Sequence, residues 1–567
     1  MIRLIAVLLL GTELWGFEPV VSMHVKVAMR DGVKLCANIY RPGVAGRLPV
    51  VLQRTPYGKV AELTTGMRAF VDRGYAVVTQ DVRGRGDSEG DFHQYLQEGQ
   101  DGEDTLSWVA RQSWSDGRVG MFGGSYVGIS QWRTALTGHP ALRAIAPAVA
   151  GGDEYFDRFY TRGGAFRIAH RLRWIAENFK PRETPVVEFE KMVTYLPLRR
   201  ADRFLTGKAV DFYQTAMAHP SYDEYWKGLS TKTRLEHVRA PALIQAGWYD
   251  VYAEGDLEMF STMRALGKMA RIIVGPWGHN LSPEMPEADF GKDATLPLRR
   301  LEIEWFDAFV KQSAAPPQPG VKYFVMGVNQ WRESPVWPPA GMELSPLYLH
   351  SKKGANSTNG DGVLEPKPQR AGKSSRYDYD PRRAVPTVGG ANCCNAKVMA
   401  WGPLDQRGVE GRRDVLVFTG EVLREDLEVA GPVRVVLHVI SSAPDTDFTA
   451  KLVDVAPDGR AKILCDGILR LRYRQGLEHE VQYRSAQVER ITIPAGVTSN
   501  VFRVGHRVRL EVSSSNFPKY DRNMNTGRAQ ADEREMRVAH QEVRYGGKWA
   551  SYIALPVVRK TGGALLP

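Results

Sequence analysis

The chain has 567 residues, of which 43 % are hydrophobic and 25 % are charged. This length is too great for one hydrophobic core, and the composition is typical of a globular protein with several domains. The formal net charge is +11. Basic and acidic residues are interleaved, however, and no zinc-finger, RNP-like or basic-helix pattern occurs, so we expect no nucleic-acid binding. We also expect no membrane-spanning helix, because no apolar window reaches 18 residues.

The first sixteen residues, MIRLIAVLLLGTELWG, place one arginine before an apolar run, which resembles a short secretory signal. A buried N-terminal strand is the alternative, because no A-x-A cleavage site follows. If residues 1–16 are a signal peptide, the protein is periplasmic or secreted, and otherwise it is cytoplasmic. The sequence does not indicate an oligomeric state.

Four cysteines are present, and they lack both CxxC spacing and the number that a disulfide scaffold needs. Cys393 and Cys394 are adjacent, which is a strained geometry for a bridge. We therefore expect free thiols at Cys36, Cys393, Cys394 and Cys465, although export would permit a disulfide. No His/Cys/Asp cluster has metal-ligand spacing, so we predict neither a metal site nor a cofactor.

Short apolar runs alternate with helix-like stretches in two parts of the chain. The first part opens with two alternating runs split by Asp31-Gly32, which predict a β-hairpin. The runs that follow are LPVVLQRTPYG, YAVVTQDVRG, GRVGMFGGS, APALIQAGWYD and ARIIVGPWGHN. This alternation predicts a parallel sheet covered by helices on both faces. We assign residues 22–150 and 233–335 to this α/β domain.

Two other regions differ in pattern. Residues 151–232 carry apolar residues at helical spacing and no clear strand, so we predict a helical cap inserted into the α/β domain. Residues 340–567 contain short alternating strands with turn residues about every 8 to 12 positions. That pattern predicts a C-terminal all-β domain, a β-sandwich of the jelly-roll type.

Ser125 lies in the stretch GRVGMFGGSYVGISQW, between a strand-like and a helix-like segment. The glycines before it permit a tight turn, and this strand–turn–helix context is that of a nucleophile elbow. The usual pattern G-x-S-x-G is not met, because Val127 stands where the second glycine is expected. A glycine-rich connector with a capping serine is the alternative. A nucleophilic serine needs a base, an acid that orients the base, and oxyanion donors.

The chain offers each of these partners in the order that α/β-hydrolases use. Asp250 follows one apolar strand and His279 follows the next, so we expect a Ser125–Asp250–His279 triad. The backbone N–H of Tyr126 is the expected first oxyanion donor. Tyr57, on the loop after an early strand, is the expected second donor through its hydroxyl, although a packing role is the alternative.

Five segments, RTPYGK, DVRGRGDSEGDF, GGSYVGISQW, AGWYDVY and GPWGHN, occur in this order. With them the chain resembles the family of cocaine-esterase-like and X-Pro dipeptidyl-peptidase α/β-hydrolases, from about Val25 onward. The elbow of that family reads G-x-S-Y-x-G, which accounts for Val127. The resemblance implies the helical cap, the jelly roll, the triad and the two oxyanion donors named above. It also implies that Trp174 and Tyr252 contact the acyl part of the substrate.

The sequence therefore predicts a serine hydrolase that cleaves an acyl ester or amide through an acyl-enzyme. An X-Pro dipeptidyl peptidase, or an α-amino-acid ester or β-lactam acylase, is the alternative. These enzymes bind a free α-amine, and in the resembling amino-acid ester hydrolases two acidic residues follow the catalytic Asp, where this chain has Tyr252 and Ala253. Acidic residues of the cap at 153, 154 and 157 keep that alternative open. A non-catalytic glycan- or cell-wall-binding protein is an alternative of another class.

Overall fold

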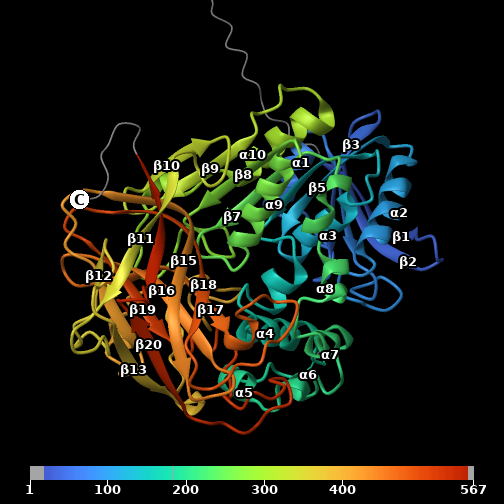
Figure 1. Ribbon diagram of the computed structural model, residues 1–567. Helices are drawn as coiled ribbons and strands as arrows, with labels where there is room; N and C mark the ends of the chain where they lie inside the picture. The colour runs from blue at the N-terminus through green and yellow to red at the C-terminus, as the bar shows by residue number, and fades with distance from the viewer. Residues whose placement is uncertain (1–17, 182, 560–567) are drawn as a thin grey trace, which may run out of the picture.

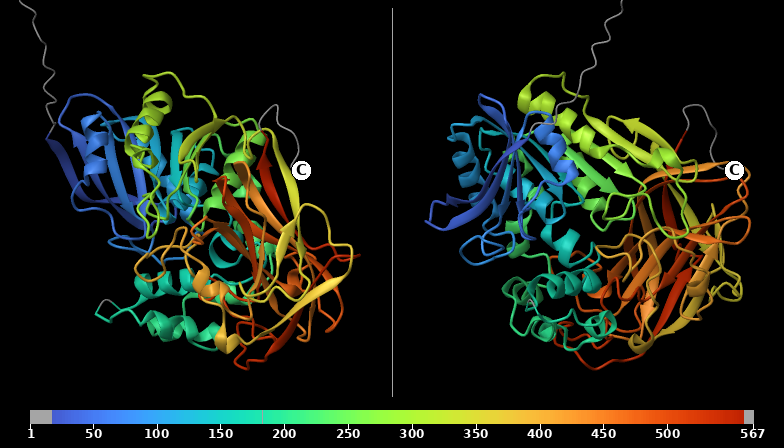
Figure 2. Two further views of the ribbon diagram at one scale, coloured as in Figure 1. Left: turned by 90° about the vertical axis from the view of Figure 1, so that its left-hand side faces the viewer. Right: turned by 180° about the vertical axis from the view of Figure 1, so that it is seen from behind.

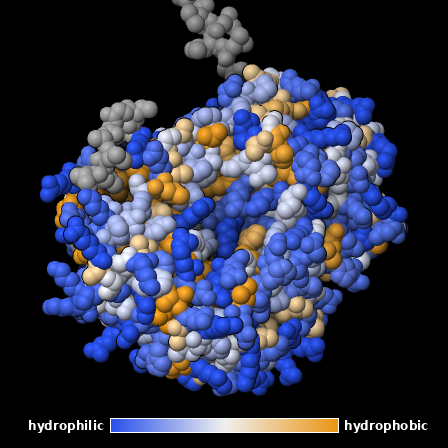
Figure 3. All heavy atoms as spheres, in the orientation of Figure 1, coloured by the Kyte–Doolittle hydropathy of each residue, from blue (hydrophilic) through white to orange (hydrophobic). Residues whose placement is uncertain are grey.

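The computed structural model describes residues 18–181 and 183–559, so the candidate signal peptide at 1–16 lies outside the described residues. The chain forms two large β-sheets with a group of helices packed beside them (Figures 1 and 2). Within the described residues, no helix has the length and apolar character needed to cross a membrane. The face shown in Figure 3 is mostly hydrophilic, with apolar residues in small groups.

The first sheet has ten strands in the order β1-β2-β4-β3-β5-β6-β7-β8-β9-β10. Strand pairing is parallel from β4 to β9, and antiparallel where β1, β2 and β10 extend the two edges. The strands are β1 (Pro19–Ala28), β2 (Lys34–Pro42), β3 (Leu48–Thr55), β4 (Ala76–Asp81), β5 (Ser115–Gly124), β6 (Leu142–Ala148), β7 (Ala242–Gly247), β8 (Ala270–Gly275), β9 (Gly320–Val325) and β10 (Gln330–Ser334). The predicted hairpin is confirmed, because β1 and β2 pair around Asp31-Gly32.

Helices cover both faces of this sheet, as the sequence predicts. In β3 the side chains of Val50 and Leu52 face one core and that of Val51 faces the other, because successive strand residues alternate between faces. Helices α2, α3 and α9 pack on the first face, and α1 and α10 pack on the second. Their bounds are α1 (Thr65–Asp72), α2 (Glu98–Ala110), α3 (Tyr126–Ala135), α9 (Ala253–Ala265) and α10 (Leu298–Phe306).

The segment between β6 and β7 is helical and has no strand among its described residues. It contains α4 (Ile168–Phe179), α5 (Phe189–Thr194), α6 (Ala201–Thr206), α7 (Asp211–Ala218) and α8 (Glu224–Leu229). In Figures 1 and 2 these helices lie beside both sheets rather than on one of them. The predicted helical insertion is therefore present, while the domain bounds assigned from the sequence stay a prediction.

The second sheet has eleven strands and confirms the predicted C-terminal all-β domain. Its pairing is antiparallel except between β12 and β14. The strands are β11 (Met342–His350), β12 (Val363–Glu365), β13 (Lys373–Tyr379), β14 (Leu416–Thr419), β15 (Leu427–Ser441), β16 (Asp447–Val455), β17 (Ala461–Arg470), β18 (Glu489–Phe502), β19 (Arg507–Ser513), β20 (Ala539–Tyr545) and β21 (Tyr552–Val558). One short helix, α11 (Arg407–Glu410), accompanies them.

A buried charge cluster joins the helical insertion to the β domain. The guanidinium of Arg470, at the end of β17, lies 3.0 Å from the carboxylate of Asp447 and 2.9 Å from that of Asp521. The same Asp521 carboxylate accepts a hydrogen bond from the backbone N–H of Phe166, in the insertion. All three charged side chains are nearly inaccessible to solvent. At this contact between the two regions, one buried cation therefore pairs with two buried carboxylates.

We expect Arg470→Met to lower the free energy of unfolding by about 3–5 kcal/mol, because two buried carboxylates lose their counter-charge. Urea unfolding of the full chain measures this change. Arg460→Met is the matched control, because Arg460 pairs with Asp458 at an exposed position of the same domain. That control should change stability by less than about 1 kcal/mol. Equal losses in the two variants would contradict the structural role of the cluster.

Candidate active site

Ser125 lies at the turn between β5 and α3, in a backbone conformation that non-glycine residues rarely adopt. Its φ is 58° and its ψ is −129°. Three hydrogen bonds hold it there: its N–H donates to the carbonyl of Ala148 at 2.9 Å, and its carbonyl accepts from the N–H groups of Gly128 and Ile129. Such strain persists only where the surroundings fix it, and it is typical of a nucleophile elbow.

Two positions of the same segment must be glycine because a side chain there would overlap its neighbours. Gly123 has a φ of +123°, and a side chain there would overlap Val127. A Cβ at Gly128 would lie 2.7 Å from the Cβ of Ala150, on the chain that leaves β6. Helix α3 can therefore start directly after Ser125 and pack close to the neighbouring strand only because both positions lack side chains.

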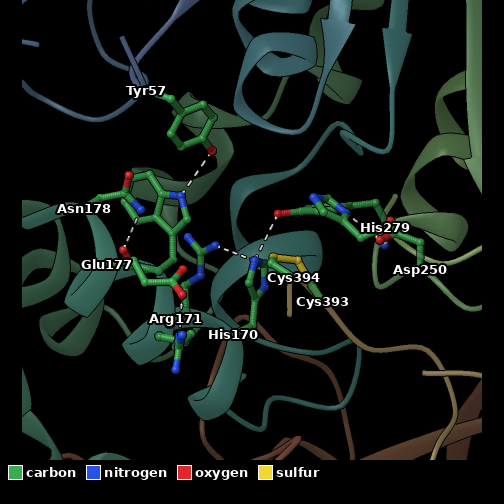
Figure 4. Close-up of a disulfide and its surroundings, with 12 residues drawn as sticks. Tyr57, His170, Arg171, Glu177, Asn178, Asp250, His279, Cys393 and Cys394 are labelled. Atoms are coloured by element: carbon green, nitrogen blue, oxygen red, sulfur yellow. Dashed lines mark hydrogen bonds and ion pairs between the residues drawn. A yellow bond between two sulfur atoms is a disulfide. The ribbon is translucent and has the colours of Figure 1, made fainter. Parts of the chain in front are cut away.

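The structure brings together Asp250 and His279, which follow β7 and β8. The Oδ2 atom of Asp250 lies 2.6 Å from Nδ1 of His279, and the Asp250 side chain is fully buried (Figure 4). The other carboxylate oxygen accepts the backbone N–H of Tyr252 at 3.0 Å, which fixes its direction. With Nδ1 engaged by the carboxylate, Nε2 of His279 is the nitrogen left to accept a proton.

The Ser125 turn adjoins the Asp250 loop through one small apolar cluster. Ala148, whose carbonyl holds the Ser125 N–H, belongs with Val149 to the same buried group as Val251 and Tyr252. The ends of β5, β6 and β7 thus meet at the carboxyl edge of the sheet. This edge is where open α/β sheets bind their ligands.

Tyr57, Tyr126 and Trp174 also lie together. The indole N–H of Trp174 donates to the hydroxyl oxygen of Tyr57 at 3.2 Å (Figure 4). Because this hydroxyl acts as an acceptor there, its own hydrogen stays available to a ligand. Tyr57 is 49 % exposed. The ring of Tyr126 is parallel to that of Trp174. The backbone N–H of Tyr126 occupies the first position of α3, where helices lack intrahelical acceptors.

Tyr252 is buried and contacts the Asp250–His279 pair on one side and His170 on the other. Its ring centroid lies 5.6 Å from that of His279, and its hydroxyl lies 3.3 Å from Nε2 of His170. Burial raises the pKa of Tyr252 to about 12. Burial and then the charge of Arg171 hold the pKa of His170 well below its ordinary value. Both side chains are therefore neutral near pH 7.

Arg171 is a residue that the sequence did not single out. It is buried, and its guanidinium donates to Nε2 of His170 at 2.7 Å. It also lies over the rings of Phe159 and Trp174. Within the described residues it forms no ion pair, and its Nε and Nη1 atoms have no hydrogen-bond partner. In the sequence, Arg171 is one arginine among apolar residues at helical spacing, so no pattern marked it as part of the site.

Cys393 and Cys394 form a disulfide in the β domain, beside His170 (Figure 4). The expectation of free thiols is therefore wrong for this pair, because the two sulfur atoms are bonded to each other. Cys36 and Cys465 are free and buried, as expected. Cys393 packs with Val251 and Tyr252. The unusual adjacent pair was visible in the sequence, but its position near Asp250 was not.

The fold also gathers groups that the sequence spacing did not reveal as metal ligands. Within the described residues, His170 with both cysteines of the pair, and His24 with Cys36 and Asp87, have candidate ligand atoms within 4.8 Å of one another. Neither group shows the local motif by which zinc sites are found in a sequence, because its members come from distant segments.

A largely parallel sheet in this strand order, a strained serine after β5 and a paired carboxylate and histidine after later strands are the features of an α/β-hydrolase. The sequence models of two domains of one family match the chain. The X-Pro dipeptidyl-peptidase (S15 family) matches residues 31–280, and the X-Pro dipeptidyl-peptidase C-terminal non-catalytic domain matches residues 314–554. The chain belongs to this family.

Similar proteins cover almost the whole chain. Cocaine esterase of a Rhodococcus species is 39 % identical over 95 % of this chain and 99 % of its own. Among solved structures, an aminopeptidase from a marine sediment archaeon, Thaumarchaeota, is 26 % identical with a TM-score of 0.85, covering 97 % of this chain and 98 % of its own. An α-amino acid ester hydrolase is 26 % identical with a TM-score of 0.82, covering 98 % of both chains. The chain is a serine hydrolase, and the alternative of a non-catalytic binding protein has no support among these relatives.

Proposed function

We propose that Ser125, His279 and Asp250 form the catalytic triad. The Oγ atom of Ser125 attacks the substrate carbonyl while Nε2 of His279 takes its proton. His279 then gives this proton to the leaving group, and an acyl-enzyme remains on Ser125. Water hydrolyses the acyl-enzyme by the same two proton transfers. The 2.6 Å contact of Asp250 with Nδ1 supports this assignment, because it selects the tautomer that can act as base.

The oxyanion of each tetrahedral intermediate is stabilised by the backbone N–H of Tyr126 and the hydroxyl of Tyr57. Tyr126 directly follows Ser125, and Trp174 connects its ring to the Tyr57 hydroxyl. The Trp174–Tyr57 hydrogen bond supports the role of Tyr57 by fixing its phenol without using its hydrogen. Trp174 and Tyr252 are the side chains that contact the acyl group of the substrate. Trp174 is hydrogen-bonded to Tyr57, and the ring of Tyr252 packs against His279.

The preferred substrate is an acyl ester without a free α-amine. The observation that carries this choice is the buried, unpaired guanidinium of Arg171, joined through His170 and Tyr252 to the Asp250–His279 pair. A substrate ammonium group would meet a like charge in a poorly solvated environment, which costs free energy.

The acidic residues of the insertion do not provide an ammonium site. Asp153, Glu154 and Asp157 are buried, and each carboxylate already has partners within the insertion. These partners are Tyr222 for Asp153, Arg158 for Glu154, and Arg162 for Asp157. A carboxylate held in this way does not turn toward a ligand without losing those bonds.

An aminopeptidase or amino-acid ester hydrolase is the second candidate function. The X-Pro dipeptidyl-peptidase sequence model and the two solved structures at 26 % identity favour it. Cocaine esterase, at 39 % identity, favours a substrate that is an ester. The positive charge of Arg171 near Asp250 and His279 supports the acyl ester over the amine-containing substrate, and an experiment with matched substrates tests this choice.

We expect Ser125→Ala to lower kcat on the order of 10⁶-fold, because the nucleophile is lost. Asp250→Asn should lower kcat on the order of 10⁴-fold, because it favours the wrong tautomer of His279. Ser107→Ala is the matched control, since Ser107 lies 3.0 Å from His139 and so forms another serine–histidine pair. Its activity and its labelling by a fluorophosphonate should equal those of the wild type. Turnover by Ser125→Ala above about a tenth of wild type would place the nucleophile elsewhere.

Tyr57→Phe should lower kcat by about 10²- to 10³-fold with little change in KM, because the oxyanion develops only near the transition state. Thermal stability should stay close to wild type, because Tyr57 is half-exposed and water can replace its hydroxyl as the acceptor of the Trp174 indole N–H. Tyr195→Phe, on a tyrosine stacked against Phe204 in the insertion, is the control. A purely packing role for Tyr57 predicts the reverse, an unchanged kcat and a shifted melting temperature.

The p-nitrophenyl esters of phenylacetate and phenylglycine differ only by the α-ammonium group of phenylglycine. We expect kcat/KM to be at least about tenfold higher for phenylacetate, because the ammonium group meets the field of Arg171. Arg171→Met should bring the ratio of the two kcat/KM values closer to one, because the charge that disfavours the ammonium group is removed. Ala-Pro p-nitroanilide, measured beside them, should be a poor substrate. A preference for phenylglycine or for the dipeptide would favour the second candidate function.

A further inference from the structure

His170, Cys393 and Cys394 form a cluster beside Tyr252. We call it the His–Cys–Cys cluster. One potential ligand atom of each residue lies within 4.8 Å of the other two. A tetrahedral zinc ion, with Zn–S bonds of about 2.3 Å and Zn–N bonds of about 2.0 Å, holds its ligand atoms about 3.3–3.8 Å apart. To reach this spacing, the His170 nitrogen and the sulfur atoms approach by up to about 1.5 Å, while the two sulfur atoms, which are bonded to each other in the disulfide, move apart after reduction.

The imidazole of His170 has a nitrogen to offer. Within the described residues, its Nδ1 atom is buried and has no hydrogen-bond partner, whereas Nε2 contacts Arg171 and Tyr252. A buried nitrogen without a partner is rare in folded proteins, and an ion that the site accepts would supply the missing partner. Binding through Nδ1 uses the lone pair of that nitrogen, so the ring proton moves to Nε2. Nε2 then donates to the hydroxyl of Tyr252 and no longer accepts from Arg171.

The cluster is also accessible from solvent on one side. Cys394 is exposed, while Cys393 and His170 are buried. Figure 4 shows the two sulfur atoms between the imidazole of His170 and the Asp250–His279 pair. A cation or a small reductant can reach Cys394 first, and the buried ligands then complete the site.

We propose that the reduced form of the His–Cys–Cys cluster binds one thiophilic divalent cation, of the class of Zn²⁺ and Cd²⁺. Reduction comes first. Two molecules of an external thiol each give one electron and one proton, the S–S bond breaks, the cysteines become two thiols, and the external thiols leave as their own disulfide. Cation binding then releases the two protons and forms two metal–thiolate bonds and one bond to His170. Two sulfur ligands and one imidazole are the donor set that zinc and cadmium prefer over calcium or magnesium.

Occupation of the site is coupled to hydrolysis through Tyr252. Its hydroxyl contacts His170, its ring lies against His279, and Cys393 packs against it. A cation that draws His170 toward the sulfur atoms therefore displaces Tyr252, and ester hydrolysis falls. This consequence, unlike the cation site itself, rests on the proposed function.

The test uses the full chain, reduced with a phosphine, desalted without oxygen and titrated with Cd²⁺ alone. We expect an ultraviolet charge-transfer band of cadmium–thiolate bonds that saturates at one Cd²⁺ per chain. The oxidised protein and the double variant Cys393→Ser/Cys394→Ser should give no band. His170→Asn should raise the Kd at least about tenfold. Circular dichroism shows whether the variants are folded.

Three controls distinguish this site from the remaining cysteines and from the proposed triad. Cys36→Ser and Cys465→Ser should keep the band, because neither cysteine belongs to the cluster. Ser125→Ala should bind Cd²⁺ with wild-type Kd, so that failure of the proposed catalytic role leaves this readout intact. Inhibition of ester hydrolysis by Cd²⁺ should occur in the reduced wild type and be absent in the double cysteine variant.

Three outcomes would overturn the proposal. Equal Cd²⁺ binding by reduced and oxidised wild type would mean that reduction creates no site. A band lost in Cys36→Ser and kept in the double variant would assign the cation to His24, Cys36 and Asp87 instead. An unchanged Kd in folded His170→Asn would mean that the imidazole of His170 is not a ligand of the cation.

Discussion

A backbone contact between the two large domains fixes the carboxyl edge of the parallel sheet. The N–H of Asn392, in the β domain, donates to the carbonyl of Tyr249 at 3.2 Å, directly before Asp250. The Asn392 side chain is fully buried and donates to the carbonyls of Gly389 and Ala400, which holds its own loop in place. The loop that carries Asp250, whose carboxylate contacts His279, is thus held from outside the α/β domain.

The same loop of the β domain reaches the histidine. Gly278 precedes His279, and a Cβ at Gly278 would overlap the indole of Trp401. The close packing of these two segments requires glycine and places the β domain against both later members of the proposed triad. This explains why two domains that fold from separate parts of the chain form one site, and why the cysteine pair that follows Asn392 lies so close to it.

The charge near Asp250 and His279 is the basis of the proposal that the substrate has no free amine. The insertion places Arg171 and His170 beside Tyr252. Its buried carboxylates, those of Asp153, Glu154 and Asp157, are paired with other side chains of the insertion. A guanidinium buried without a counter-ion is costly, so the surrounding rings of Phe159 and Trp174 are part of what makes it tolerable. Cys393 and Cys394 lie beside this group, and their redox state determines whether they form a disulfide or can bind a cation as proposed.

The sequence alone determined the α/β sheet, the helical insertion, the all-β domain and the order of Ser125, Asp250 and His279, because these depend on local periodicity and on turns at strand ends. It could not predict that the adjacent Cys393 and Cys394 lie beside the Asp250 loop, that Arg171 lies near it, or that His170 and the two cysteines form a cluster. The positions of these groups depend on segments far apart in the chain that meet only when the β domain packs against the sheet and the insertion. Local patterns carry no information about such contacts, so only the tertiary structure decided them.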